Sequence, residues 1–153
     1  MLSSRFTNAI AASLVVWGVA VGAVVAQPSS PAEPAAQKST NDGVYSKAQA
    51  DGAKAQFDKI CAECHPFSDA EKKKPKDVPL GGETFFESWT GRSLGEIAST
   101  IALTMPNDGS AVVSDEEALN LVAFILQRNG FPAGTKKLDK AGEAAVIARP
   151  AKK

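Results

Sequence analysis

The chain has few of the side chains that proteins use to bind transition metals. Its 153 residues include one histidine, two cysteines and two methionines. A structural zinc site usually takes four cysteine or histidine ligands, and Cys61, Cys64 and His65 are all that this chain offers. A zinc site here would therefore need carboxylates to complete it.

The chain also lacks an excess of charge of either sign, since basic and acidic residues number 17 each. Proteins that bind nucleic acids usually carry a basic excess on one face or in one domain. The composition therefore gives no indication of nucleic-acid binding.

Charged side chains are nearly missing from residues 1–26, where Arg5 is the only one. An apolar run from Ala9 to Ala26 follows Arg5 and ends in small residues. This order is typical of a secretory signal peptide, so we expect cleavage after Ala26 and an exported protein. An uncleaved anchor is the alternative, because about 18 apolar residues just cross a bilayer.

Without residues 1–26 the chain keeps about 127 residues, which fits one domain. Loss of Arg5 leaves 16 basic and 17 acidic residues, so the net charge is about −1. Residues 27–43 are rich in Pro, Ser, Ala and Gln and contain no aromatic residue. Such a composition predicts a flexible leader.

Cys61, Cys64 and His65 form the pattern Cys-x-x-Cys-His, the attachment signature of a c-type haem. Two thiols at this spacing reach the two vinyl groups on one porphyrin edge, and the adjoining imidazole coordinates the iron. Three interpretations compete: a zinc site completed by carboxylates, a thioredoxin-like redox pair, and a structural disulfide or chance match. A thioredoxin-like pair belongs in a βαβ pattern, and no strong strand period surrounds this motif. The motif and its context together favour haem.

One residue is left as a candidate for the second axial ligand of such an iron. His65 is the only histidine, which excludes bis-histidine ligation within the chain, and Met1 lies in the predicted signal peptide. Met105 is followed by Pro106, which blocks helix continuation and favours an extended backbone at Met105. A lone methionine is otherwise a gap-filling core residue. Beside the haem motif we interpret Met105 as an iron ligand.

Three capping-box patterns, beginning at Ser46, Ser93 and Ser114, predict the starts of three helices. The first helix should run to about Ile60 and deliver Cys61. The second should end at Pro106, beside the proposed ligand. The third is apolar around much of its circumference, and Gly130 is placed to end it with a left-handed cap.

The segments between these helices give weaker signals. Residues 66–82 read as a loop rich in proline and lysine, and residues 83–89 as a short helix. Trp89 and Arg92 both donate hydrogen bonds, which the carboxylates of haem propionates need. A core aromatic and a surface charge are the alternative interpretations of these two residues. Residues 131–153 show little periodicity and predict an extended tail that wraps the domain and frays at its end.

At this point the residues resemble a family. A capped helix running into the haem motif, a helix ending at Met105-Pro106, and a last helix containing residues 122–126 resemble a class I c-type cytochrome of bacteria. Residues 44–45, 89–92, 104–106 and 129–134 are similar to monohaem cytochromes found alone or fused beside quinoprotein alcohol dehydrogenases. The resemblance covers residues 44–135, the expected cytochrome c domain, and leaves 136–153 as a C-terminal tail.

The resemblance implies an all-α fold of three to five helices around one covalent haem. It implies thioether bonds at Cys61 and Cys64, His65 as proximal ligand and Met105 as distal ligand. It also implies that the first and last helices cross near two aromatic residues, Phe57 and Phe124.

Two departures from the family pattern stand out. The family usually has a glycine where this chain has Ala53, with Gly52 one place earlier. The family's Pro-x-Leu, whose proline carbonyl accepts the N–H of the proximal histidine, appears here as Val78-Pro79-Leu80. A backbone carbonyl near Val78 is the expected substitute.

The function that the resemblance implies is one-electron transfer in the periplasm, not catalysis. Its partners would be redox proteins such as a periplasmic dehydrogenase and a terminal oxidase or other cytochrome, with membrane contact only if the N-terminal segment is uncleaved. A haem enzyme or gas sensor with an open sixth position is one alternative. A permanent cytochrome subunit of a dehydrogenase complex is another.

Two groups of side chains are expected to support this function. The first is an apolar shield that keeps water from the haem: Phe85, Ile101, Leu119 and Phe124. The second is a run of lysines that is the densest cluster of one sign in the mature body, a docking patch or an ordinary solvated loop: Lys72, Lys73, Lys74 and Lys76.

Overall fold

The computed structural model describes residues 37–150, which form four α-helices and three short 3-10 helices, with only isolated β-bridges between extended segments. The α-helices are α1 (Lys47–Ile60), α2 (Gly82–Trp89), α3 (Leu94–Thr104) and α4 (Asp115–Arg128). The 3-10 helices are η1 (Thr40–Asp42), η2 (Asp69–Glu71) and η3 (Lys140–Gly142). The all-α prediction is confirmed. The predicted signal peptide and the first ten residues of the predicted leader lie outside the described range.

Each of the three predicted caps begins a helix. The side chains of Ser46, Ser93 and Ser114 accept a hydrogen bond from the third backbone N–H of α1, α3 and α4, respectively. In α3 and α4 a glutamate returns the bond and completes the capping box. In α1 the box is incomplete, because the side chain of Gln49 bonds Asn120 and the backbone of Leu138 instead.

The predicted helix ends are also confirmed. Helix α3 ends at Thr104, and Met105 follows in an extended conformation with φ −120° and ψ 145°. A proline at the next position disfavours the helical region for Met105, which explains the stop. Helix α4 is followed by Asn129 and by Gly130, whose φ of +79° is the left-handed cap that the sequence predicts.

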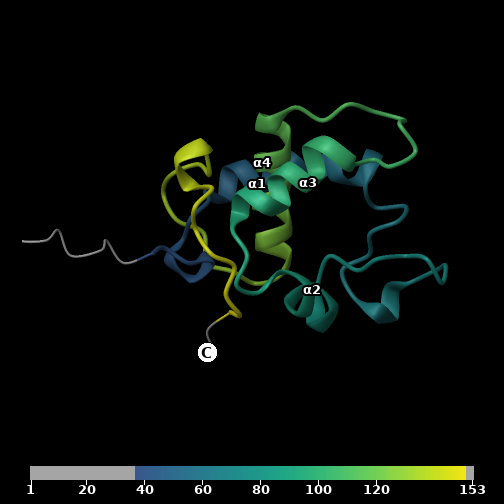
Figure 1. Ribbon diagram of the computed structural model, residues 1–153, viewed down its shortest axis with the longest axis horizontal. Helices are drawn as coiled ribbons and strands as arrows, with labels where there is room; N and C mark the ends of the chain where they lie inside the picture. The colour runs from purple at the N-terminus through teal and green to yellow at the C-terminus, as the bar shows by residue number, and fades with distance from the viewer. Residues whose placement is uncertain (1–36, 151–153) are drawn as a thin grey trace, which may run out of the picture. The chain divides into compact units, whose positions relative to one another are not determined.

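Helices α1 and α3 both pack against α4, which passes through the centre of the domain (Figure 1). The rings of Phe57 and Phe124 lie 5.0 Å apart where α1 crosses α4, so the predicted crossing is confirmed. Small side chains allow the close approach, since Ala50 and Ala53 are both buried. Gly52 is exposed and has no neighbour within 4 Å of where a Cβ would lie, so it plays no part in this approach.

The segments before α1 and after α4 lie side by side at one end of the domain (Figure 1). The N–H of Thr40 donates to Val146 O at 2.9 Å, and the N–H of Val146 donates to Lys38 O at 2.9 Å. Thr40 and Ile147 are fully buried. The tail therefore wraps the domain as predicted, but the last residues of the predicted flexible leader belong to the folded body, because these bonds and this burial hold them there.

None of the helices within residues 37–150 is long and apolar enough to cross a membrane.

Candidate functional site

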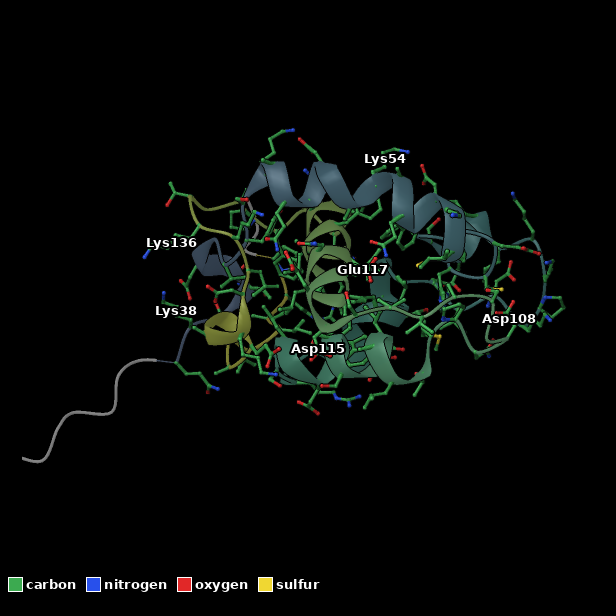
Figure 2. All side chains as sticks on the ribbon, turned by 90° about the horizontal axis from the view of Figure 1, so that it is seen from above. Lys38, Lys54, Asp108, Asp115, Glu117 and Lys136 are labelled. Carbon is green, nitrogen blue, oxygen red and sulfur yellow. The ribbon has the colours of Figure 1, made fainter. Side chains whose placement is uncertain are left out.

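A cavity of about 430 Å³ brings together most of the predicted site residues. This volume lies in the range of sites for small molecules and cofactors. The predicted residues that line it are Cys61, Cys64, His65, Trp89 and Met105. Asp108 also lines the cavity, and Figure 2 shows it at the end of the domain opposite Lys38 and Lys136. The site therefore lies away from the end where the terminal segments meet.

The end of α1 places the two thiols. The N–H of Cys61 still donates to Phe57 O at 2.9 Å, while the N–H groups of Cys64 and His65 both turn back to Cys61 O at 3.1 and 3.0 Å. Both thiols are free, so the disulfide interpretation finds no support in the geometry. Cys61 is half-buried, and burial raises the pKa of its thiol to about 11. Cys64 is exposed at the cavity.

The imidazole of His65 is oriented by a backbone carbonyl. Its Nδ1 lies 2.9 Å from Val78 O, a distance at which the ring N–H donates to the carbonyl. In that tautomer Nε2 carries no proton and is free to bind a metal ion. The Val78 carbonyl thus takes the place of the proline carbonyl that the family pattern leads one to expect.

Met105 joins the cavity from the end of α3. Its N–H donates to Ile101 O at 3.1 Å, the last hydrogen bond of the helix, and its half-buried side chain lines the cavity. The only other methionine, Met1, lies outside the described residues. Met105 is therefore the one thioether that the described part of the chain brings to this cavity.

The apolar lining differs in part from the predicted shield. Ile101 lines the cavity as expected, but Phe85, Leu119 and Phe124 are buried in the core and do not line it. Three other apolar residues line the cavity with it: Ile97, four residues before Ile101 on α3, and Leu121 and Ile125, four apart on α4. That spacing puts each pair on one helix face. The same spacing in the sequence could have been used to predict these lining residues.

Only one of the two predicted propionate donors lines the cavity. Trp89 lines the cavity, whereas Arg92 does not. The Arg92 guanidinium lies 4.4 Å above the Trp89 ring, and its Nε donates to Glu96 Oε1 at 3.0 Å. Arg92 therefore stacks on the Trp89 ring and already pairs with Glu96, a carboxylate in the first turn of α3. Propionate binding by either residue stays a prediction.

The four lysines of the run have different surroundings. Lys74 pairs with Glu63 at 2.9 Å and Lys72 lies 3.7 Å from Asp69, so part of the positive charge is offset locally. The hydrogen bond from Lys74 holds the pKa of Glu63 below its ordinary value. Lys76 alone among the four lysines lines the cavity.

The donor set and the shape of the site fit haem c. Two thiols, one imidazole and one thioether are the groups through which proteins attach and ligate this cofactor, and an apolar lining suits a porphyrin. The cavity is lined by the end of α1, by the motif residues 61–65 that follow it, by the segments from Lys76 to Ser110 and by α4.

A comparison with protein families identifies the same fold and cofactor. The family model described as "Cytochrome C oxidase, cbb3-type, subunit III" matches residues 48–125, just over half of the chain, from the start of α1 to near the end of α4. No curated protein and no solved structure matches the chain. The matched region is a c-type cytochrome domain, which is an electron-transfer module and not an enzyme. Its cofactor is haem c, an iron porphyrin bound covalently to the chain. The chain therefore belongs to this cytochrome family and has the all-α class I cytochrome c fold.

Proposed function

We propose that this cytochrome is a periplasmic one-electron carrier whose haem is attached through Cys61 and Cys64 and ligated by His65 and Met105. One observation carries the proposal: the two thiols, the only histidine of the chain and the thioether of Met105 line a single cavity. When bound, haem c supplies reversible one-electron chemistry at its iron. The protein supplies the ligands, their orientation and an apolar surrounding.

Each ligand has a distinct part in this proposal. The Val78 carbonyl fixes the tautomer of His65 and makes Nε2 more basic. The thioether of Met105 is a soft ligand that raises the reduction potential. With His65 and Met105 both bound to it, a haem iron would have no open position for a substrate or a gas.

Export and the choice of partners are proposed from the sequence. Residues 1–26 have the order of a signal peptide, and the resemblance to cytochromes of quinoprotein alcohol dehydrogenases suggests such a dehydrogenase as electron donor. A terminal oxidase or another cytochrome would accept the electron. A periplasmic fraction that contains the haem-stained protein, with a mature N-terminus at Gln27, would support this; recovery of the intact chain in membranes would support the anchored alternative.

A second candidate is a permanent subunit of a larger complex, since the matched family is described as a subunit of an oxidase. The two cases differ in the size of the isolated protein. Gel filtration of a detergent extract should return a free carrier at the mass of one chain. Elution together with the cofactors of a dehydrogenase or an oxidase would favour the permanent subunit.

The role of Met105 is tested by optical spectra of the purified protein. We expect a weak far-red sulfur-to-iron charge-transfer band in the ferric state and slow binding of carbon monoxide in the ferrous state. Met105→Ala should remove the band and admit carbon monoxide, and Met105→His should lower the potential by roughly a few tenths of a volt.

Leu103→Ala is the matched control, because this side chain lies two positions away and is 83% exposed. It should leave the band and the carbon monoxide reaction unchanged. A wild-type protein that is high-spin and binds carbon monoxide at once would contradict the proposal and favour the enzyme or sensor alternative.

The role of the cysteines is tested by denaturation. Thioether bonds keep the haem on the chain through acid and organic extraction, so the wild-type protein should retain one haem per chain. The double variant Cys61→Ala/Cys64→Ala should lose it in the same extraction. A colourless, zinc-loaded protein from a host that assembles haem c would refute the attachment.

A further inference from the structure

Asp77 is the only buried charged side chain among residues 37–150, with 4% of its surface exposed. Its Oδ2 accepts hydrogen bonds from the backbone N–H groups of Lys73 at 2.8 Å and Lys74 at 2.9 Å. The N–H of Asp77 donates in turn to Lys74 O at 3.0 Å. Residues 73–77 are therefore closed into a turn by one carboxylate. The two backbone donors hold the pKa of Asp77 below its ordinary value, so the carboxylate is ionised at neutral pH.

This turn leads directly into residues 77–80, which we call the proximal strap. The strap lies against the haem motif: the N–H of Val78 donates to Cys64 O at 3.0 Å, and the N–H of Leu80 donates to Pro66 O at 2.8 Å. At its far end the strap is held by Asn129, whose Nδ2 donates to Leu80 O at 2.7 Å. At its near end the carboxylate of Asp77 holds it.

The position of the Val78 carbonyl matters because it accepts the hydrogen bond from His65 Nδ1. The side chain of Val78 is 52% exposed and gives the carbonyl little support through packing. A valine also leaves its own φ angle free, whereas a proline at this position would fix it. The backbone around Val78 therefore sets the direction of the carbonyl. Pro79 favours an extended conformation at Val78, the Val78 N–H is bonded to Cys64 O, and the turn of Asp77 fixes the chain just before it.

We propose that Asp77 is a positioning residue for His65, whose carboxylate fixes the turn before the proximal strap and thereby keeps the Val78 carbonyl on His65 Nδ1. The inference rests on the proposed function, in which His65 is the proximal ligand. A carbonyl held at Nδ1 makes the ligating nitrogen more basic and so favours the ferric state. Loosening the turn should weaken that bond, raise the reduction potential and expose the Nδ1 proton to exchange.

Three substitutions separate position from charge. Asp77→Ala removes the acceptor and the charge, Asp77→Asn keeps an acceptor oxygen without the charge, and Asp77→Glu keeps the charge but displaces the acceptor by one methylene. Asp69→Ala is the matched control, because Asp69 is an exposed carboxylate of the same loop that bonds Thr84 and lies near Lys72. Its loss changes the charge of the loop without touching the turn or the strap.

The decisive measurement is the solvent exchange rate of the His65 Nδ1 proton in the holoprotein, followed by NMR. We expect exchange at least about tenfold faster than wild type in Asp77→Ala and faster also in Asp77→Glu, because the turn loses its acceptor geometry. In Asp77→Asn and Asp69→Ala the rate should stay within about threefold of wild type. The potential should rise more in Asp77→Ala than in Asp77→Asn.

The outcomes distinguish this inference from the function on which it rests. If the exchange rate is the same in wild type and Asp77→Ala, Asp77 does not position His65. If the potential shifts equally in Asp77→Ala and Asp77→Asn and stays unchanged in Asp77→Glu, Asp77 acts through its charge. If Asp77→Ala does not fold, the exchange rates of Asp77→Asn and Asp77→Glu are enough to decide between positioning and charge. A wild-type spectrum without histidine and methionine ligation would instead refute the proposed function.

Discussion

Gly134 shows how a single residue fixes the end of the fold. Its N–H donates to Tyr45 O at 2.7 Å, and a Cβ at this position would clash with the backbone oxygen of Gly43. The obstacle is backbone, which cannot move aside as a flexible side chain can. The contact joins the segment after α4 to the segment before α1, so the absence of a side chain at Gly134 is a requirement of the fold.

We therefore expect Gly134→Ala to lower the free energy of unfolding by at least about 2 kcal/mol. The matched control is Gly52→Ala within α1, where a Cβ meets nothing within 4 Å. There the better helix propensity of alanine should raise the free energy of unfolding by roughly 0.5–1 kcal/mol. Denaturant titration of both holoproteins measures the two changes. Similar values for the two variants would show that the Gly134 contact is not tight in solution.

Functional residues that belong to a local sequence motif could be predicted from the sequence. Residues whose role depends on a contact with a distant part of the backbone could not. The spacing of Cys61, Cys64 and His65 is local and specific, so the sequence alone is enough to predict the haem. Asp77 is hard to single out among the lysines around it, although an aspartate after a Lys-Pro-Lys sequence has the chemistry of a turn residue. Its importance depends on the strap lying against the haem motif, which is a tertiary contact.

At the scale of the helices, the caps do most to define where each element begins. Helix α4 starts at Asp115 with Ser114 as its cap, and Ser114 and Glu117 bond each other's backbone N–H groups. The pKa of Glu117 lies below its ordinary value, chiefly because the N–H of Ser114 bonds it. Such reciprocal bonds satisfy N–H groups that the helix itself leaves without partners. The sequence therefore predicts the starts of three helices correctly. Only the return bond of the capping box in α1 is missing, because the Gln49 side chain bonds tertiary partners instead.

The element-scale prediction concerns the cap of α4. Ser114→Ala should lower the free energy of unfolding by about 1 kcal/mol, because an orphan N–H at the helix start loses its acceptor. Ser99→Ala is the control, since Ser99 is an exposed position inside α3 where alanine is the better helix former. Thermal unfolding of the two holoproteins should show a lower midpoint for the first and an equal or higher midpoint for the second. An unchanged midpoint for Ser114→Ala would mean that water replaces the cap without loss.

The core of the domain is completed by residues of the C-terminal tail, whose burial cannot be predicted from hydrophobic periodicity. Residues 136–150 form no α-helix, yet Leu138, Ala145 and Ile147 are buried in the core. They are held by backbone bonds to distant partners, such as Leu94 N–H to Ala145 O at 2.9 Å and Ile147 N–H to Arg92 O at 2.8 Å. Nothing in the local sequence marks these pairings, so the tail could be predicted to wrap the domain but not to complete its core.

Electron exchange by the whole molecule should depend on the charges around the cavity. The sequence carries equal numbers of basic and acidic residues, so any steering of a partner must come from a local field. Lys74 and Lys72 lie beside carboxylates, and Lys76 is the lysine of the run that lines the cavity. We therefore expect Lys76, and not the run as a whole, to influence how charged reactants approach the haem.

The test uses two small oxidants of opposite charge, the ferricyanide anion and the tris(phenanthroline)cobalt(III) cation, with the reduced holoprotein. Lys76→Gln should slow oxidation by the anion about two- to threefold at 0.01 M salt and speed oxidation by the cation, because one positive charge at the cavity is removed. The difference should shrink at 0.1 M, where the Debye length falls from about 30 Å to about 10 Å. Lys73→Gln is the matched control, since Lys73 belongs to the same run but does not line the cavity. If the two variants change both rates equally, electrons leave the haem elsewhere, and the rim around Met105 and Pro106 becomes the better candidate for the docking surface.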